Sequence, residues 1–521
     1  MTWTSLHVRL SWEVGHVDAF IADVLAPELT AHRAAGRLAD WFYMRYWRTG
    51  PHLRVRLRDA RVDLADRLRE LVAAAGHPVL DADPAAFPAE DDRLPHGDVR
   101  EVPYEPEVER YGGPQALPLA EEVFCRSTDV AVAVLRSART PGAKITAAVE
   151  LVMATTSALR LDRVEAASWL RSLATGWRQA REPVGTPSLG SHVAARTLHA
   201  ARATRLAARW DRLEEHATGV VAYWAEQVRG ADLPRYAWAS QLHMLCNRLG
   251  LDPEAERTVC RLVAMTAEDP DGPVPFHEDG ATAPDRRYLA ASRFHSGVPD
   301  QGPLPAATPP APTPPWWRDV PLPEVAPPSG SLVEALSTRH TARGAELAGP
   351  LDAAQLATLL WTAQGALPDG RRPYPSAGAR HSARLRVLAW RVTGLEPGVY
   401  EVDEARRTLA HVAPAPPAED VAATSMWFGR GVDRVDPTTT PALLALYVRV
   451  GALRKAYGLR ALRLAFTEAG HLAQNLALVA ASTGLALGVL GGFYDDMAHD
   501  VLCLDGVDDA LVYLMPVASG A

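Results

Sequence analysis

Residues 41–58 read WFYMRYWRTGPHLRVRLR, and this stretch decides how the first half of the chain is interpreted. Two alternating runs flank Trp47–Pro51, whose Gly-Pro pair is a turn signal, so the stretch predicts a β-hairpin. A strand period of two then places one basic residue at every second position of the second run, on a single face: His52, Arg54, Arg56 and Arg58.

Same-face neighbours on a strand lie roughly 7 Å apart, so three guanidiniums and an imidazole would form one row. Such a row repels itself unless an anion neutralises it. The alternative is an edge strand that uses charge to avoid pairing with other chains. Residues elsewhere in the chain are needed to separate these two interpretations.

The composition makes the basic row a local feature. The 521 residues carry a formal net charge of −8, so nothing global predicts nucleic-acid binding, and a small anionic ligand is favoured. The four cysteines have no metal-ligand spacing, which predicts no metal site and a cytoplasmic protein. The N-terminus has no apolar signal segment, and the uncharged run 476–493 contains four glycines, so we expect a buried helix, turn and strand and no membrane span.

The chain is too long for one core, and we expect an α+β protein of two domains. Residues 1–298 mix short alternating runs with a helical second half, whereas residues 331–521 alternate helices and strands. The proline-rich segment 299–330 between them is predicted to be a linker whose second half, with Trp316 and Trp317, docks on a domain.

Three separated motifs stand out in the second domain. ALSTRHTARG spaces Arg339 and Arg343 four apart at an expected helix start, where guanidiniums and amides would clamp a phosphate. PSAG contains Ser376 and Gly378 in a turn before a strand, where glycine would let backbone approach a planar ligand. The third motif ends in the pair Gly491-Gly492.

In their order and spacing, and with LEPGVYEVD between them, these motifs closely resemble the azoline dehydrogenases of the nitroreductase superfamily. The resemblance covers nearly all of residues 331–521. It implies a homodimeric FMN enzyme that oxidises thiazolines or oxazolines to azoles. Carried onto this sequence, the implied cofactor-binding residues are Arg339, Thr341, Arg343, Ser376, Gly378, Gly491 and Gly492.

The same family has adjacent Lys-Tyr residues that remove a proton, and this sequence departs from that pattern. It reads Arg454-Lys455-Ala456-Tyr457, so Tyr457 aligns while the lysine is displaced by one position. One position rotates a side chain by about 100° around a helix. Tyr457 is therefore the stronger catalytic candidate, and Lys455 the weaker, with a surface lysine as the alternative.

Three motifs of the first domain, RYWRTGPHLRVRLR, ERYGG and HMLCNRLGLDPEAE, resemble the C-terminal domain of lantibiotic-type dehydratases over roughly residues 1–270. Its fusion to an azoline dehydrogenase is similar to the bifunctional enzyme of lactazole-type thiopeptide biosynthesis. The resemblance implies β-elimination of glutamate from glutamylated Ser or Thr of a ribosomally made precursor peptide. By motif, the implied catalytic residues are Arg54, Arg56, Arg110 and His243.

The residue types suit that chemistry. A glutamyl group carries a free carboxylate that guanidiniums can clamp, and histidine titrates near neutrality and can act as base or acid. The substrates would come from a tRNA-dependent glutamylating enzyme and a YcaO-type cyclodehydratase. Two alternatives for the first domain stay open: a pyridine-forming cycloaddition catalyst, or a peptide-binding scaffold.

Overall fold

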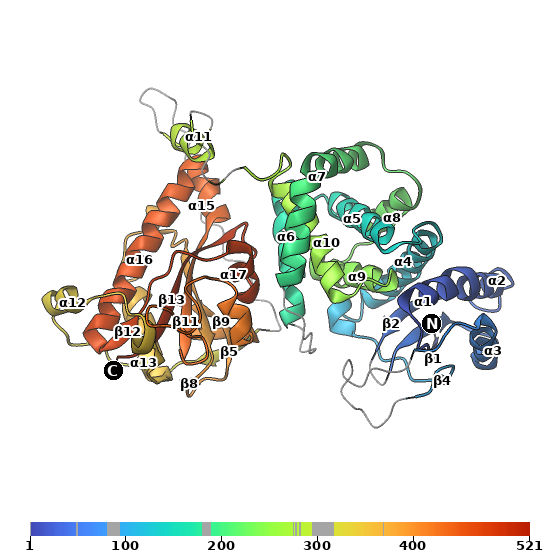
Figure 1. Cartoon of the computed structure of the whole chain (residues 1–521), viewed down its shortest axis with the longest axis horizontal. Coiled ribbons are helices and arrows are strands. Elements are labelled where there is room, and N and C mark those ends of the chain that lie inside the picture. The colour runs from blue at the N-terminus through green and yellow to red at the C-terminus, as the bar shows by residue number, and fades with distance from the viewer. Residues whose placement is uncertain are drawn as a thin grey trace. The chain divides into compact units, whose positions relative to one another are not determined.

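The computed structural model of the chain describes residues 2–47, 50–80, 94–179, 189–274, 276, 279–280, 283–293, 317–367 and 369–520. The chain divides into two compact units, which are described separately (Figure 1). Unit 1 comprises Met1–Ala167 and Ala194–Gly272, and unit 2 comprises Ser168–Val193 and Pro273–Ala521. The predicted α+β class is confirmed.

Unit 1 begins with a four-stranded antiparallel sheet in the order β2-β3-β1-β4. The predicted hairpin is present, with β2 and β3 paired from Asp40 opposite Arg58 to Tyr46 opposite His52. The elements of this part are β1 (Trp3–Arg9), α1 (Val14–Phe20), η1 (Ile21–Leu25), α2 (Ala26–Ala34), β2 (Asp40–Tyr46), β3 (His52–Arg58), α3 (Ala65–Ala75), β4 (Val99–Glu101) and η2 (Val108–Tyr111).

The alternation in β3 sorts its side chains as the sequence predicts. Leu53, Val55 and Leu57 are at most 1% exposed and belong to a core that α1, η1, α2 and α3 complete. Burial of such aliphatic side chains contributes about 1.5–3 kcal/mol each, which fixes the strand register. The basic residues consequently point to the opposite face of the sheet.

The further elements described up to residue 268 are helices. Thr140 and Asp252 accept hydrogen bonds from backbone N–H groups and so cap α5 and α10. The helices are α4 (Leu117–Ser137), α5 (Pro141–Ala158), α6 (Arg163–Gln179), α7 (Leu189–His216), α8 (Gly219–Gly230), α9 (Arg235–Arg248) and α10 (Pro253–Glu268).

Unit 2 is built on a seven-stranded sheet in the order β12-β13-β11-β7-β9-β10-β5. Its strands are β5 (Arg318–Pro321), β7 (Ala383–Ala389), β9 (Gly398–Asp403), β10 (Thr408–Pro414), β11 (Ala442–Arg449), β12 (Leu485–Leu487) and β13 (Asp509–Ser519). The other elements are α11 (Pro284–Ala291), α12 (Leu332–Thr338), η3 (Gly344–Ala348), β6 (Leu351–Asp352), α13 (Ala353–Gln364), η4 (Ala377–Ala379), β8 (Val392–Thr393), α14 (Ala418–Ala422), α15 (Val450–Tyr457), η5 (Gly458–Arg460), α16 (Ala461–Thr483) and α17 (Asp495–Val501).

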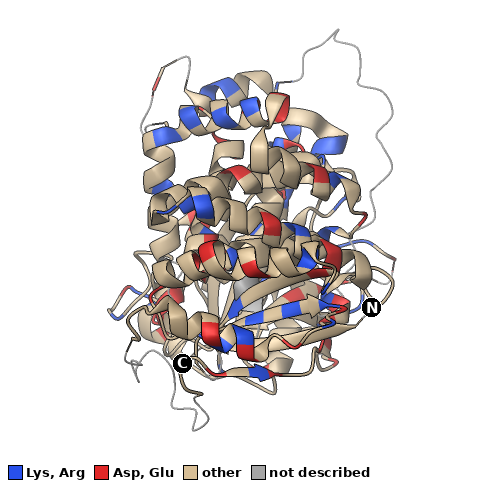
Figure 2. Ribbon diagram, turned by 90° about the vertical axis from the view of Figure 1, so that its right-hand side faces the viewer, with Lys and Arg blue, Asp and Glu red and all other residues tan. Residues whose placement is uncertain are grey.

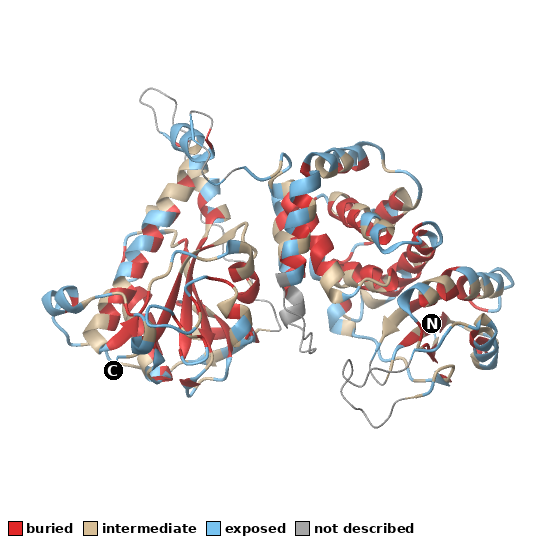
Figure 3. Cartoon of the chain, in the orientation of Figure 1, coloured by how far each residue is buried: buried red, intermediate tan, exposed pale blue. Residues whose placement is uncertain are grey.

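Both faces of this sheet are buried (Figure 3). Along β11, Leu444 and Leu446 pack with α13 and α16, whereas Leu443 and Tyr447 pack with α14 and α17 on the other side. A strand buried on both faces reads as a continuous apolar run, which explains ALLALYV in the sequence.

Two segments of unit 2, the one before β5 and the one around Arg339–Arg343, bear on the sequence predictions. The proline-rich segment 299–316 lies outside the described residues, but β5 follows it directly and pairs with β10, and Trp317 packs on the core. The helix start predicted at Arg339–Arg343 is wrong, because α12 ends at Thr338. The chain turns there since the N–H of Ala342 donates to the carbonyl of Leu487, 3.0 Å away, and Gly344 has a left-handed φ of 52°.

Candidate functional site

The basic face of the unit 1 sheet is formed by residues of three paired strands. Figure 2 colours the positions of Lys and Arg along the ribbon blue. Cross-strand register aligns Arg54 with His7 of β1 and Met44 of β2. The next row along the strands aligns Arg56 with Ser5 and Phe42. The face therefore combines guanidiniums, an imidazole and a hydroxyl.

The environment of the arginines changes along β3. Arg58 forms ion pairs with Asp40 at 3.6 Å and with Glu122 of α4 at 4.0 Å. Arg56 is 5% exposed, donates to Ser5 Oγ, and has its Cζ 5.2 Å from the centre of the Tyr104 ring. Among the described residues no carboxylate forms an ion pair with Arg56, so its charge is buried without an acidic partner.

Burial and the neighbouring Arg54 lower the pKa of Arg56 to about 10, which still leaves the guanidinium charged at neutral pH. Arg54 is half-buried and stacks on Tyr46, with Cζ 3.5 Å from the ring centre. A desolvated guanidinium is costly unless an anion or hydrogen-bond acceptors compensate it. The face is thus electrostatically prepared for a carboxylate or another small anion.

Two histidines occupy the middle of this face, and the sequence interpretation assigned neither to catalysis. The rings of His7 and His52 stack with centroids 4.9 Å apart and an interplanar angle of 29°. Burial is the main cause that lowers the pKa of each imidazole to about 3. For His7, repulsion from His52 and from the neighbouring arginines adds to this lowering of the pKa. Only the register, which sets His7 opposite Arg54, identifies His7 as a member of this face.

Arg110 contacts helix α9 one turn before His243. The exposed Arg110, in η2, donates through Nε to Ser240 Oγ at 3.1 Å, and Ser240 lies one turn before His243. The Nδ1 atom of His243 is 2.9 Å from Oε2 of Glu256, a carboxylate only 2% exposed. The carboxylate accepts from Nδ1–H and so favours the tautomer with the proton on Nδ1.

Helix α9 is anchored to the edge of the sheet that carries the basic face. The side chain of Asn247 accepts from the backbone N–H of Arg45 at 2.8 Å and donates to its carbonyl at 2.9 Å. These two bonds satisfy the backbone groups of Arg45 at the free edge of β2, and His243 lies one helical turn away from Asn247. The structure thus places the four predicted elimination residues in unit 1 as two pairs, one on β3 and one at α9.

In unit 2, the predicted phosphate-binding residues adjoin the strand before the glycine pair. Arg339 and Arg343 flank Thr341, and among the described residues neither arginine forms an ion pair with a carboxylate. Ala342 between them bonds to β12, and that strand leads to Gly491 and Gly492. A Cβ on Gly492 would meet Trp427 Nε1 at 3.0 Å, so glycine keeps this approach open.

The PSAG turn is held by a buried carboxylate. Glu468 of α16 is 2% exposed and accepts from Ser376 Oγ at 2.7 Å, Ser382 Oγ at 3.1 Å and Ala383 N at 2.9 Å. The hydroxyl of Ser376 also accepts from the N–H of His381 at 2.8 Å. The serine therefore shapes the turn, which leaves backbone groups of the turn to meet a ligand.

Gly378 and Tyr457 are neighbours in the structure although 79 residues separate them. Gly378 has φ 57°, and a Cβ there would lie 2.5 Å from Tyr457 Oη. Tyr457 is half-buried against the core, whereas Lys455 is exposed at the end of α15. The displaced lysine thus does not share the surroundings of the tyrosine.

The two groups of predicted flavin residues lie at different heights of α16. The PSAG turn contacts Glu468, while Thr338 lines a cavity of about 270 Å³ with Ala480 and Ala481. Twelve helical residues span about 18 Å. One copy of the chain therefore places the Arg339–Arg343 segment beside β12 and Gly378 beside Tyr457, at different heights of α16.

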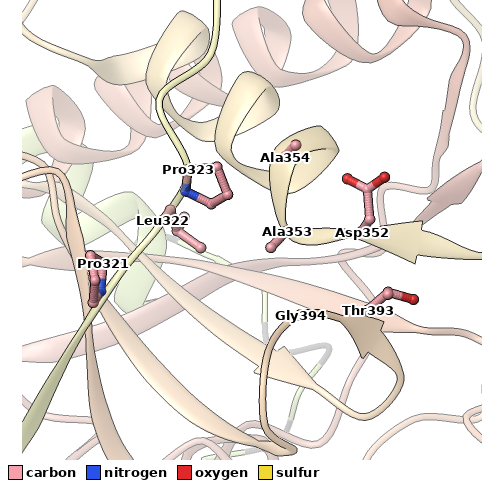
Figure 4. A pocket seen from close by; sticks show the side chains of 8 residues that line it. All are labelled: Pro321, Leu322, Pro323, Asp352, Ala353, Ala354, Thr393 and Gly394. Atoms are coloured by element: carbon pink, nitrogen blue, oxygen red, sulfur yellow. The ribbon is translucent and has the colours of Figure 1, made fainter.

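The larger pocket of unit 2 lies elsewhere and carries little chemistry. About 520 Å³ in volume, it is lined mainly by small and apolar residues of β5, α13 and β8 (Figure 4). Its carboxylate, Asp352, accepts from the N–H of Gln355 at 2.8 Å and caps α13. In the described part of the chain, no three His, Cys, Asp or Glu side chains are grouped to hold a metal ion, and no helix is long and apolar enough to span a membrane.

The chain combines an α+β unit that has a basic sheet face with a nitroreductase-like α+β unit. Comparison with family models agrees. Residues 3–267 match the lantibiotic biosynthesis dehydratase C-terminal family, and the chain belongs to that family. Residues 336–520 match the nitroreductase family and form the second domain of this chain.

Individual relatives resemble one half of the chain at a time. A Methanocaldococcus jannaschii protein named as a nitroreductase is 28% identical over 169 residues, covering 32% of this chain and 81% of the relative. A pyridine synthase of thiomuracin biosynthesis is 21% identical, covering 52% of this chain and 98% of the other, with a TM-score of 0.41. The tRNA-dependent lantibiotic dehydratase of a Microbispora species is 21% identical, covering 51% and 28% respectively, with a TM-score of 0.29.

Proposed function

We propose that unit 1 eliminates glutamate from glutamylated Ser or Thr of a ribosomally made thiopeptide precursor, and that unit 2 oxidises azolines to azoles with FMN. The observation that carries the first activity is the buried Arg56, which has no carboxylate partner among the described residues and lies beside Arg54. Membership of a dehydratase family supports it.

In the elimination, Arg54 and Arg56 hold the free carboxylate of the glutamyl group and so fix the ester on the basic face. A base removes the Cα proton, the electron pair of that bond forms the Cα=Cβ double bond, and the Cβ–O bond breaks. Glutamate departs as a carboxylate. The Nε2 of His243, with Nδ1 held by Glu256, accepts the proton, and the exposed Arg110 orients the peptide near α9.

For the oxidation, the residues of unit 2 fit a flavin nucleotide. Arg339, Thr341 and Arg343 would hold its phosphate, and Gly378, Gly491 and Gly492 would admit its ring system. FMN, when bound, supplies the two-electron oxidant. Tyr457 moves a proton at Oη, and Ser376 keeps the turn in shape through Glu468.

The separation of the two flavin groups along α16 supports a homodimer in which each copy completes the site of the other. The precursor reaches this enzyme after a tRNA-dependent glutamylating enzyme has made the ester. A YcaO-type cyclodehydratase supplies the azoline. Neither reaction requires the chain to contact nucleic acid or a membrane, and the expected compartment is the cytoplasm.

Mass spectrometry of a glutamylated, azoline-containing peptide incubated with the enzyme tests both activities. We expect loss of the glutamyl mass plus conversion of azolines by loss of two hydrogens. A pyridine product together with release of the leader peptide would instead mean that unit 1 catalyses the cycloaddition. An intact glutamyl ester with normal azole formation would instead make unit 1 a peptide-binding scaffold.

A further inference from the structure

The histidine pair on the basic face has an unused proton-accepting nitrogen. His7 is 9% exposed, and its Nε2 is buried without a hydrogen-bond partner among the described residues. His52 is different: its Nδ1 lies 2.8 Å from the carbonyl oxygen of Gly50, and its Nε2 accepts from Arg54 Nε at 3.4 Å. A proton can therefore be added at His7 Nε2 without breaking a hydrogen bond.

Cations face this pair from three strands. Arg54 and Arg56 come from β3, Arg9 comes from β1, and Arg100 lies opposite His7 on β4. One carboxylate, Asp98, is 2.7 Å from Arg100 Nε. Burial and the guanidiniums lower the pKa of each imidazole to about 3, so both are neutral at pH 7.

We propose that His7 is the proton-holding residue of the basic face, so that a carboxylate bound against Arg54 and Arg56 draws a proton onto the His7–His52 pair. An anion offsets the repulsion from the arginines and gives a protonated Nε2 an acceptor. The two imidazoles are in contact, so a charge on His52 lowers the pKa of His7 and the pair is expected to take up one proton. The carboxylate is the glutamyl group, and in this respect the inference rests on the proposed function.

The stoichiometry of elimination gives the coupling a purpose. Breaking Cα–H and Cβ–O releases one proton and one carboxylate for each double bond formed. The carboxylate that forms is the former ester end of glutamate, while the basic face holds the free carboxylate of the same molecule together with a proton. The proton on the pair is released when glutamate leaves the face.

Isothermal titration calorimetry of the full-length protein with L-glutamate or glutarate tests the coupling. Measurements at about pH 5 and pH 8, in two buffers of different ionisation enthalpy, report the protons taken up on binding. One opposite charge raises a pKa by about 1–3, so we expect uptake at the lower pH only, with affinity about two- to tenfold higher there. The sign follows because the anion raises the pKa, which favours the protonated form.

The His7→Gln variant should lose most of this uptake and the affinity gain at low pH, while affinity at pH 8 changes by less than about twofold because the arginines remain. His16→Gln is the matched control. His16 belongs to another stacked pair of unit 1, with His77 at 4.4 Å, and should behave as wild type. Should His7→Gln fail to fold, His52→Gln removes the other half of the pair.

Two results overturn the proposal. The first is a result on the wild-type protein: the proposal fails if neither probe binds, or if the heat of binding at about pH 5 is the same in both buffers. Undiminished uptake by a folded His7→Gln protein would overturn it as well. The elimination assay on wild-type protein is independent, so glutamate loss without proton-linked binding sinks this inference alone, whereas an intact ester sinks the proposed function.

Discussion

Arg56 and Arg58 project from the same face of β3, two residues apart, yet only Arg58 has acidic partners among the described residues. Arg58 neutralises Asp40, which also contacts Arg33 at 3.0 Å and Arg126 at 3.4 Å. Arg56 is buried beside Ser5 and Tyr104 instead. One face of one strand thus contains an arginine with acidic partners and, among the described residues, a buried arginine without one.

This difference predicts opposite phenotypes for two matched variants. Arg56→Ala should lower glutamate elimination about 10²–10³-fold, because a preorganised cation is lost from the reacting centre. Arg58→Ala should lower the free energy of unfolding by about 1 kcal/mol, since Asp40 keeps two other cations, and should leave elimination nearly unchanged. Single-turnover elimination rates and urea unfolding distinguish the two; equal rates for both variants would contradict the assignment.

The Glu256 carboxylate should matter to elimination through His243. Glu256→Gln loses the charged acceptor that holds His243 Nδ1 at 2.9 Å, so the imidazole is free to adopt the other tautomer. We expect a fall smaller than that of His243→Gln, for which about 10²–10⁴-fold is typical of a general base or acid. The pH–rate profile is the measurement. An unaltered profile in Glu256→Gln would show that the ion pair does not orient the base.

The periodicity of β3 was sufficient to predict which side chains share a face, because strand alternation is a local property. Which arginine is paired depends on β2 and on Glu122 of α4, and no local signal identifies those contacts. His7 was missed for the same reason: only the β1–β3 register places it opposite Arg54.

The expected helix start at Arg339 failed for a related physical cause. The spacing of the two arginines suits a helix, but the N–H of Ala342 bonds to β12, which is 145 residues further along the chain. Helix α12 has already ended at Thr338, and the left-handed Gly344 begins the short 3₁₀ helix η3. Tertiary hydrogen bonds outweighed local propensity, so the phosphate interpretation now relies on the two guanidiniums and not on helix amides.

Glu468 should be the most sensitive carboxylate of the flavin site. Glu468→Gln weakens three hydrogen bonds to a buried charge, and we expect a loss of about 2–3 kcal/mol in the free energy of unfolding of unit 2 together with lower FMN retention. The control is Glu396→Gln, because Glu396 is exposed and pairs with Arg318; it should change stability by no more than about 0.5 kcal/mol. Thermal melting with flavin absorbance measures both effects. Similar losses in the two variants would argue against a special role for Glu468.

Gly378 should resist substitution for a reason beyond backbone strain. Gly378→Ala adds a Cβ that would lie 2.5 Å from Tyr457 Oη, so the tyrosine must move. Gly370→Ala is matched for strain, with φ 81° and no atom within 4 Å of the new Cβ. Each should cost about 1–2 kcal/mol of stability, but only Gly378→Ala should abolish azole formation while glutamate elimination continues. If both variants lost azole formation, backbone strain would explain the loss and the contact with Tyr457 would not.

Tyr457 and Lys455 provide the last comparison, because the two residues lie two positions apart on α15 in different environments. Tyr457 Oη is close to Gly378, whereas Lys455 is exposed. Tyr457→Phe should therefore lower azole formation about 10²-fold or more, as expected when a proton-transfer group is lost, with flavin content unchanged. Lys455→Ala should retain nearly full activity, since a lysine displaced by one position points about 100° away. If Lys455→Ala were as impaired as Tyr457→Phe, α15 would have to rotate when the substrate binds. Stopped-flow measurement of flavin reduction by the azoline peptide would then locate the defect in the oxidation step.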